Sequence, residues 1–108
     1  MNLKTSRIEA IVIGGSIEGK PSQYPKRRSD LNYRTIEGET IILNREEGQL
    51  HQLNPSASFI WDCCDGNSNI AEIIDRLAGA YEVEPSTARK DVEEVLLKLR
   101  KSNLLEAN

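Results

Sequence analysis

The chain has 108 residues, 38% of them hydrophobic, and a formal net charge of −3. This length fits one domain, and the modest apolar fraction predicts that part of the chain stays outside a packed core. The acidic balance disfavours nucleic acid as a partner, although a local basic site is compatible with it. No apolar run approaches the roughly 20 residues of a membrane span, and the amino-terminal residues lack the pattern of a secretory signal. We therefore expect a cytoplasmic protein with no membrane partner.

The first 30 residues differ in composition from the rest of the chain. Residues 8–13 are rich in Ile and Val, which predicts at most one short strand. Residues 16–30 combine one Gly and two Pro residues with the basic run at 26–28. Because such a mixture of breakers and charges rarely packs, we expect residues 1–30 to form a flexible amino-terminal arm. The folded domain is expected over residues 31–106.

An antiparallel meander of three short strands is predicted next. Two β-prone runs, at 33–37 and 40–44, are separated by Gly38-Glu39, which is the spacing of a tight turn. A second turn at 45–48 leads to a third run at 49–53. The meander therefore leaves two sheet edges open.

The middle strand is expected to divide its side chains between the two faces of this sheet. Successive side chains of a strand point to opposite faces, so alternate residues belong together. We expect Ile41 and Leu43 to face the helices, and Thr40, Ile42 and Asn44 to face the other side.

Three helices are predicted to follow the sheet, and the first two have clear start signals. Asn54 is a favoured N-cap, Pro55 suits the first helical position, and Gly66 supplies the residue that ends the first helix. Asn69 caps the second helix, and Glu72 three residues later comes close to a capping box.

The third helix is expected to open at Pro85 and to end at Asn103, which tolerates the left-handed conformation. Each helix carries an apolar stripe at three- and four-residue spacing. The stripes are Leu53, Ala57, Ile60, Trp61 and Cys64; Ile70, Ile73, Ile74, Leu77, Ala78 and Tyr81; and Ala88, Val92, Val95, Leu96 and Leu99. Strands followed by helices in this order predict an α+β fold, winged helix-turn-helix-like, with a three-stranded antiparallel sheet and three helices.

The chemistry needed for catalysis is sparse in this chain. Cys63 and Cys64 are adjacent, so they do not form a disulfide framework, and we expect Cys64 to be buried and Cys63 partly exposed. His51 is the only His, which leaves a zinc site without a ligand set. No glycine motif cradles a phosphate. We therefore expect a binding protein that is not an enzyme, with no metal and no cofactor.

The chain resembles the PqqD family over roughly residues 25–106. The most specific part of the resemblance is Leu53-Asn54-Pro55-x-Ala57-x-x-Ile60-Trp61. Further matching positions run from Tyr33 to the closing Leu104-Leu105-Glu106. Gln52 and Asn103 depart from the family, because each stands where Gly is common.

This resemblance implies a recognition element for ribosomally made, post-translationally modified peptides. Such a protein holds the leader segment of a precursor peptide and presents it to a modifying enzyme, commonly a radical SAM enzyme. In the synthesis of coenzyme PQQ the family member plays this chaperone part. The precursor peptide and the modifying enzyme are therefore the expected partners.

In the family the leader adds beside the third strand and lies against the third helix. An open edge strand suits this role because its unpaired backbone groups can bind an extended peptide. The resemblance thus implies a peptide-binding site at Gln49, Leu50, His51, Gln52, Leu53, Val95, Leu97, Lys98 and Lys101. A further hypothesis is that residues 8–13 occupy the same edge when no leader is bound.

The residues leave two other interpretations of the function open. The runner-up is a DNA-binding winged helix, because the element order is shared and residues 26–28 are basic. Its recognition helix would include residues 89–95, which mix both signs of charge and would push three carboxylates towards phosphate. The third reading is a thiol enzyme that uses Cys63 as its nucleophile.

Overall fold

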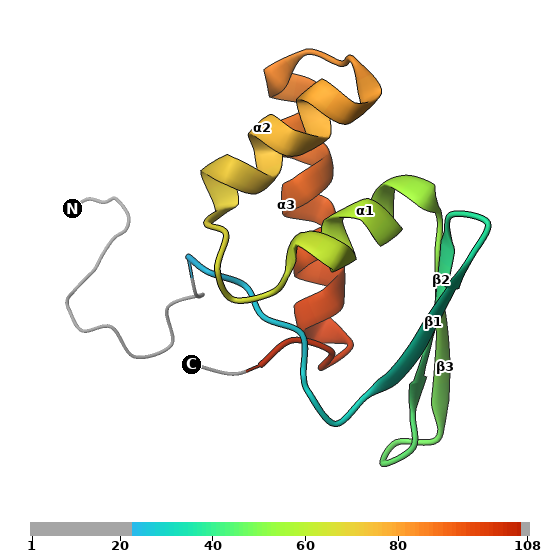
Figure 1. Cartoon of the computed structure of the whole chain (residues 1–108). Helices are drawn as coiled ribbons and strands as arrows, with labels where there is room; N and C mark the ends of the chain where they lie inside the picture. The colour runs from blue at the N-terminus through green and yellow to red at the C-terminus, as the bar shows by residue number, and fades with distance from the viewer. Residues whose placement is uncertain (1–22, 107–108) are drawn as a thin grey trace, which may run out of the picture.

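The computed structural model describes residues 23–106, which fold into a three-stranded antiparallel sheet followed by three helices (Figure 1). The strands are joined in the order β1-β2-β3, and all three helices lie on one side of the sheet. This arrangement confirms the predicted α+β fold class. The elements are β1 (Asn32–Ile36), β2 (Glu39–Asn44), β3 (Gln49–Leu53), α1 (Pro55–Cys63), α2 (Ile70–Tyr81) and α3 (Pro85–Lys101).

The β1–β2 hairpin turns through Glu37 and Gly38, one residue earlier than the sequence indicates. Both residues have positive φ, at 52° and 83°, which suits the twist of a two-residue hairpin. The resulting register pairs Ile36 with Glu39 and Tyr33 with Ile42. Glu37 therefore belongs to the turn and not to the strand.

The assignment of side chains to the two faces of β2 was wrong. Thr40 and Ile42 are fully buried and Asn44 is 1% exposed, so these three side chains face the helices. Ile41 and Leu43 are only half-buried and lie on the outer face. Thr40 is accepted inside because it has partners there: it donates its backbone N–H to Ser58 Oγ at 2.9 Å, and its hydroxyl bonds the hydroxyl of Thr35 at 2.8 Å.

The helix start signals are confirmed. The side chain of Asn54 accepts the backbone N–H of Ala57 at 2.8 Å, and Asn69 forms a full capping box with Glu72. Helix α3 begins at Pro85, as predicted, and Asn103 just beyond it has a φ of 62°. Helix α1 ends at Cys63, three residues before Gly66, because the chain already leaves the helix at Cys64.

The core lies where the three helices meet the inner face of the sheet. Trp61 and Ile42 are fully buried at its centre, with Leu104 and Leu105 closing one end. The predicted stripes of α1 and α3 are largely inside, with Leu53 and Val95 at the margin. Tyr81, predicted as buried, is 44% exposed because it stands at the end of α2 and stacks edge-on against Phe59.

Residues 1–22 lie outside the described part of the chain, so the strand expected at 8–13 and most of the expected arm stay predictions. Residues 23–30, the described part of that arm, contact the helical side of the molecule (Figure 1). Lys26 and Arg27 form isolated bridges with Asp65 and Leu105, and the backbone N–H of Ile70 donates to the carbonyl oxygen of Gln23 at 3.1 Å. Over residues 23–106, no helix is long and apolar enough to cross a bilayer.

Candidate peptide-binding site

Strand β3 is an edge of the sheet, because among the described strands it pairs only with β2. One side of its backbone therefore has no strand partner, and an extended peptide can pair there. The sequence Gln49-Leu50-His51-Gln52-Leu53 forms this strand, as predicted.

A groove of about 590 Å³ lies between the end of β3, the start of α1 and the part of α3 from Asp91 to Lys101. Helix α3 lies behind α1 in the view of Figure 1. The lining residues come mainly from α3, with the end of β3 and the start of α1 opposite. The groove is lined by Gln52, Leu53, Asn54, Ser56, Ala57, Asp91, Glu94, Val95, Leu97, Lys98, Leu99 and Lys101.

Six of the nine residues predicted for the site line this groove. They are Gln52, Leu53, Val95, Leu97, Lys98 and Lys101. The other three, Gln49, Leu50 and His51, belong to the same edge strand but lie beyond the groove lining. The structure therefore brings the helix positions and one end of the strand together, and the remaining strand residues extend the edge away from the groove.

Successive side chains of β3 point to opposite faces of the sheet, and this decides which of them can contact a bound peptide. Leu50 is 69% exposed and pairs with Leu43, so its side chain lies on the outer face of the sheet. His51 pairs with the buried Ile42, so its ring lies on the inner face, where Nε2 is buried without a hydrogen-bond partner among residues 23–106. The side chain of Gln52 is already engaged, because Nε2 donates to Glu39 at 3.0 Å. The contribution of this strand is therefore mainly its backbone.

The α3 wall of the groove has an apolar middle and two charged ends. Leu97 is 52% exposed and Val95 is half-buried, so both offer apolar surface to a guest. Lys98 and Lys101 belong to the last turn of α3, where positive charge also complements the helix dipole. The groove is therefore positive towards the carboxyl end of α3.

Asp91 and Glu94 give the opposite end of the groove a negative charge. Sequence reasoning missed these two residues as part of the site. Their spacing holds the signal that could have found them, because 91, 94, 98 and 101 recur at three- and four-residue intervals and so share one helix face. A bound peptide with one acidic end and one basic end would complement this charge distribution.

The two thiols are enclosed. Cys63 is 6% exposed, against the expectation of a partly exposed side chain, because α1 directs it into the helical core. Burial raises the pKa of Cys63, with the nearby Arg76 opposing the shift, and burial raises the pKa of Cys64 to about 12. Residues 23–106 contain no group of three His, Cys, Asp or Glu side chains placed to hold a metal ion. Neither thiol has the depressed pKa that a cysteine nucleophile requires.

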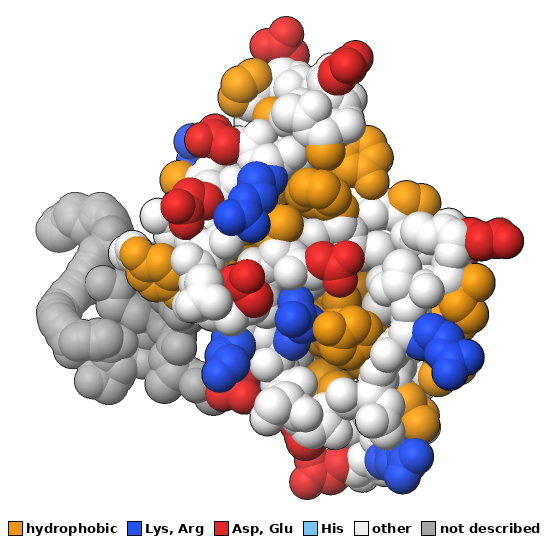
Figure 2. Space-filling view, in the orientation of Figure 1, with side chains coloured by type: hydrophobic (Ala, Val, Ile, Leu, Met, Phe, Trp, Pro, Cys, Tyr) orange, Lys and Arg blue, Asp and Glu red, His pale blue; other side chains and the backbone are white. Residues whose placement is uncertain are grey.

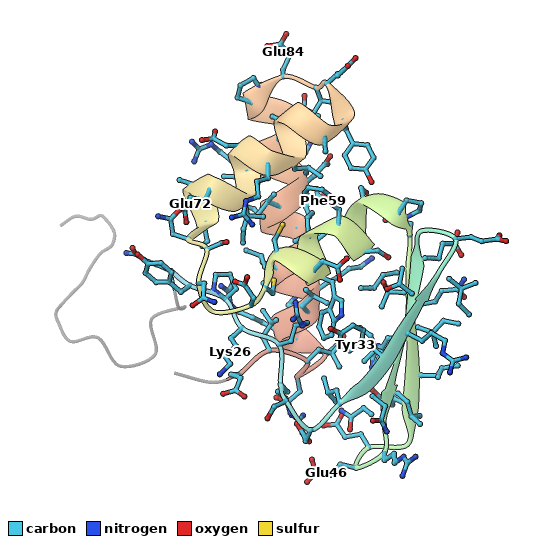
Figure 3. The ribbon with its side chains drawn as sticks, in the orientation of Figure 1. Lys26, Tyr33, Glu46, Phe59, Glu72 and Glu84 are labelled. Atoms are coloured by element: carbon cyan, nitrogen blue, oxygen red, sulfur yellow. The ribbon has the colours of Figure 1, made fainter. Side chains whose placement is uncertain are left out.

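The basic run at 26–28 is largely used inside the molecule. Arg27 donates from Nη1 to the carbonyl oxygens of Trp61 and Asp62 at 2.9 and 3.0 Å. Its guanidinium lies over the ring of Tyr33, which is placed between the sheet and the helices (Figure 3). Arg28 forms ion pairs with Asp30 and Glu46 at 2.6 and 3.2 Å. Two of the three cations that suggested a phosphate contact therefore have partners within the domain.

Comparison with known proteins shows a matching family and similar solved structures. A family model described as coenzyme PQQ synthesis protein D (PqqD) matches residues 39–105. The solved complex of TbiB1 with the TbiA(beta) leader peptide is 25% identical, with a TM-score of 0.69 over 77% of this chain and 96% of that one. Lasso peptide synthetase B1, complexed with the leader peptide, is 24% identical, with a TM-score of 0.66 over 78% of this chain and 99% of that one. No curated protein gave a significant match. The family match spans well over half of the sequence and includes the edge strand, α1 and the groove-lining helix, and the chain belongs to the PqqD family.

Proposed function

We propose that the protein captures the leader segment of a ribosomally made precursor peptide and presents it to a modifying enzyme. The observation that carries this proposal is the joining of an open edge strand to a groove along α3. The two similar complexes, TbiB1 and the lasso peptide synthetase B1, each hold a leader peptide, which supports the proposal. On this view the protein is not an enzyme, and it contributes recognition without a cofactor.

The leader would bind as a fourth strand beside β3. Backbone groups of residues 49–53 then pair with the peptide, and every second peptide side chain points towards α3. Leu97 and Val95 receive an apolar side chain, because they form the apolar part of that wall. Backbone pairing supplies sequence-independent affinity, and the groove supplies selectivity.

Charge sets the direction that we propose for the leader. Lys98 and Lys101 attract acidic leader residues at one end of the groove, whereas Asp91 and Glu94 disfavour them at the other. A leader with an acidic segment next to its apolar anchor is therefore the preferred guest. Reversing the order of these segments should weaken its binding.

The partner enzyme is the second half of the proposed function. The family membership supports a biosynthetic enzyme that acts on the bound precursor, and we propose a radical SAM enzyme in this role. Because precursor peptides are made on ribosomes, we propose that capture takes place in the cytoplasm.

Calorimetric titration with a synthetic leader tests the proposal directly. The probe is the leader of the precursor peptide, which we expect a short gene beside the gene for this protein to encode. His51→Pro removes one amide donor from β3, and Leu50→Pro removes its neighbour. Because neighbouring amides on a strand point to opposite sides, we expect one variant to lose pairing with β2 and the other to stay folded and bind the leader at least tenfold more weakly.

A matched control uses proline far from the edge. Ser86→Pro lies in the first turn of α3, where proline is tolerated, and should bind the leader like the wild-type protein. A folded edge variant with unchanged affinity would contradict strand addition at β3.

The alternative, a DNA-binding winged helix, is not favoured. Asp91, Glu93 and Glu94 stand on the helix that would have to approach phosphates, and Arg27 and Arg28 are engaged within the domain. A gel shift at low salt with duplex DNA should show no complex.

A further inference from the structure

The outer face of the sheet carries apolar residues from all three strands. In an antiparallel sheet with one solvated face, hydrophobic side chains normally point inward and polar ones outward. Here β2 points Ile42 inward together with the polar Thr40 and Asn44, whereas Ile41 and Leu43 lie outside. The outer face therefore exposes apolar surface of the kind that often marks an interaction site.

The strand register joins these residues into one continuous stripe. Leu43 lies directly opposite Leu50, Ile41 is the next outer residue along β2, and Ile36 is placed diagonally from it on β1. Ile36 is 51% exposed and Leu50 is 69% exposed. We call Ile36, Ile41, Leu43 and Leu50 the outer stripe.

None of the described elements covers the outer stripe. The three helices all lie on the opposite side of the sheet (Figure 1). Figure 2 shows hydrophobic side chains beside Lys and Arg side chains along the margin of the molecule that the sheet forms. The stripe thus remains available to a partner when residues 23–106 are folded.

Opposite charges flank the outer stripe on its two sides. Arg34 pairs with Ile41 from β1, and Glu39 lies on β2 next to Gln52, whose side-chain amide donates to it at 3.0 Å. Both charged side chains are exposed, and both lie on the outer face because their cross-strand partners do. The stripe runs diagonally between them, from Ile36 on β1 to Leu50 on β3.

This layout is complementary to itself. A two-fold axis that runs along the outer stripe places the stripe of one copy on the stripe of another and exchanges its two flanks. Arg34 of each copy then faces Glu39 of the other, and the apolar residues cover one another. A symmetric interface needs one surface that fits itself in this way.

We propose that a second copy of this chain covers the outer stripe, forming a two-fold dimer through the sheet faces. The groove along α3 lies on the helical side of the sheet, so each copy in the dimer keeps its own groove open. Such a dimer presents two binding grooves on its two outer sides.

Charge-reversal variants test the dimer in the full-length protein. Arg34→Glu places two like-charged pairs in the interface, and Glu39→Arg does the same with the opposite sign. We expect each variant alone to self-associate about tenfold more weakly than the wild-type protein in sedimentation velocity over a concentration series.

An equimolar mixture of the two variants gives the decisive measurement. In the mixed dimer the two substituted positions, which now carry opposite charges, face each other, and the unchanged Arg34 of one variant faces the unchanged Glu39 of the other. Association should therefore return close to the wild-type level. Charge pairs within one copy cannot be restored by mixing two proteins. Arg89→Glu and Glu93→Arg, which make the same charge changes on exposed positions of α3, are the controls and should leave association unchanged.

Two results would overturn the proposal. One is a monomeric wild-type protein throughout the concentration series, which would leave the outer stripe to a different kind of protein. The other is self-association that the two single variants do not weaken, which would place the contact elsewhere on the molecule. Circular dichroism of each variant confirms that the comparison is between folded proteins.

Discussion

Ser58 on α1 accepts a hydrogen bond at 2.9 Å from the backbone N–H of Thr40 on β2. The hydroxyl of Ser58 also donates to the carbonyl oxygen of Leu53 on β3 at 3.2 Å. One buried side chain therefore ties two strands to the helix that packs on them. Because Leu53 lines the groove, this bond also helps to fix the wall of the candidate peptide site.

Replacing Ser58 with Ala should destabilise the protein. Thr40 is fully buried, so its backbone N–H would be left without a partner in the core. An unsatisfied buried donor costs about 1–3 kcal/mol. Urea denaturation should show a lower midpoint with an unchanged slope. Ser86→Ala, at an exposed position of α3, is the control and should change the free energy of unfolding by less than about 0.5 kcal/mol.

The helix starts were predictable because their signals are local. Asn54 with Pro55, and Asn69 with Glu72, use hydrogen bonds that span only a few residues, and both caps form as the sequence indicates. The order of strands and helices follows from the same short-range patterns. The fold class therefore required no knowledge of tertiary contacts.

The sequence of β2 alone could not predict which of its side chains point towards the helices. Ile41, Ile42 and Leu43 are consecutive, so the strand has no alternation of apolar and polar residues that would choose a face. The choice depends on tertiary contacts, such as the one between Thr40 and Ser58, which lie 18 positions apart. The acidic end of the groove was missed for a related reason, since Asp91 and Glu94 acquire a role only when α3 lies beside β3.

Arg27 should be more important for stability than an ordinary surface cation. Its guanidinium donates to two carbonyl oxygens and lies 5.9 Å from the centre of the Trp61 ring. Arg27→Lys keeps the charge but cannot reproduce this planar fork, so we expect a loss of about 1–2 kcal/mol. Thermal denaturation followed by the fluorescence of Trp61, the only Trp, measures it.

The matched control for Arg27 is Arg45→Lys, at an exposed turn position. It should shift the melting temperature by less than the Arg27 variant does, because no described contact depends on the guanidinium group of Arg45. Equal effects of the two substitutions would mean that the contacts of Arg27 add no net stability.

The basic end of the groove should govern how salt affects leader binding. Lys98→Glu and Lys101→Glu each replace an attraction to acidic leader residues by a repulsion. We expect each substitution to weaken binding about two- to tenfold at low salt, with a smaller effect at high salt. Calorimetry at two ionic strengths provides the measurement. Lys90→Glu, exposed on α3 but outside the groove, should have no comparable effect.

Substitution of Leu97 tests whether the apolar part of the α3 wall of the groove binds the leader. Leu97 is 52% exposed, so Leu97→Asp removes apolar surface from the groove without emptying the core. Loss of a bound apolar anchor of this size is worth about 1.5–3 kcal/mol, which corresponds to a roughly tenfold or greater loss of affinity. The free energy of unfolding should hardly change. If leader affinity were retained, the peptide would have to pass β3 without contacting α3.

The raised pKa of the Cys64 thiol predicts a loss of folding stability at high pH. Burial raises the pKa of this thiol from 9.0 to about 12, so folding favours its neutral form. The associated stabilisation is complete below the unfolded pKa and is lost as the pH rises from there through about 12. Between about pH 8 and about pH 11 the wild-type protein should therefore lose about 1–3 kcal/mol more than Cys64→Ala.

Comparing the change with pH, and not the absolute stability, removes the cost of the cavity that Cys64→Ala creates. Burial raises the pKa of Cys63 as well, but Arg76 opposes that shift, so Cys63→Ala should reduce the alkaline loss by less. If wild-type protein and Cys64→Ala lost the same stability on going to high pH, the thiol would have to ionise as easily in the folded protein as in the unfolded chain. Cys64 would then be open to water, and the packing of α1 against the rest of the core would be looser than its full burial indicates.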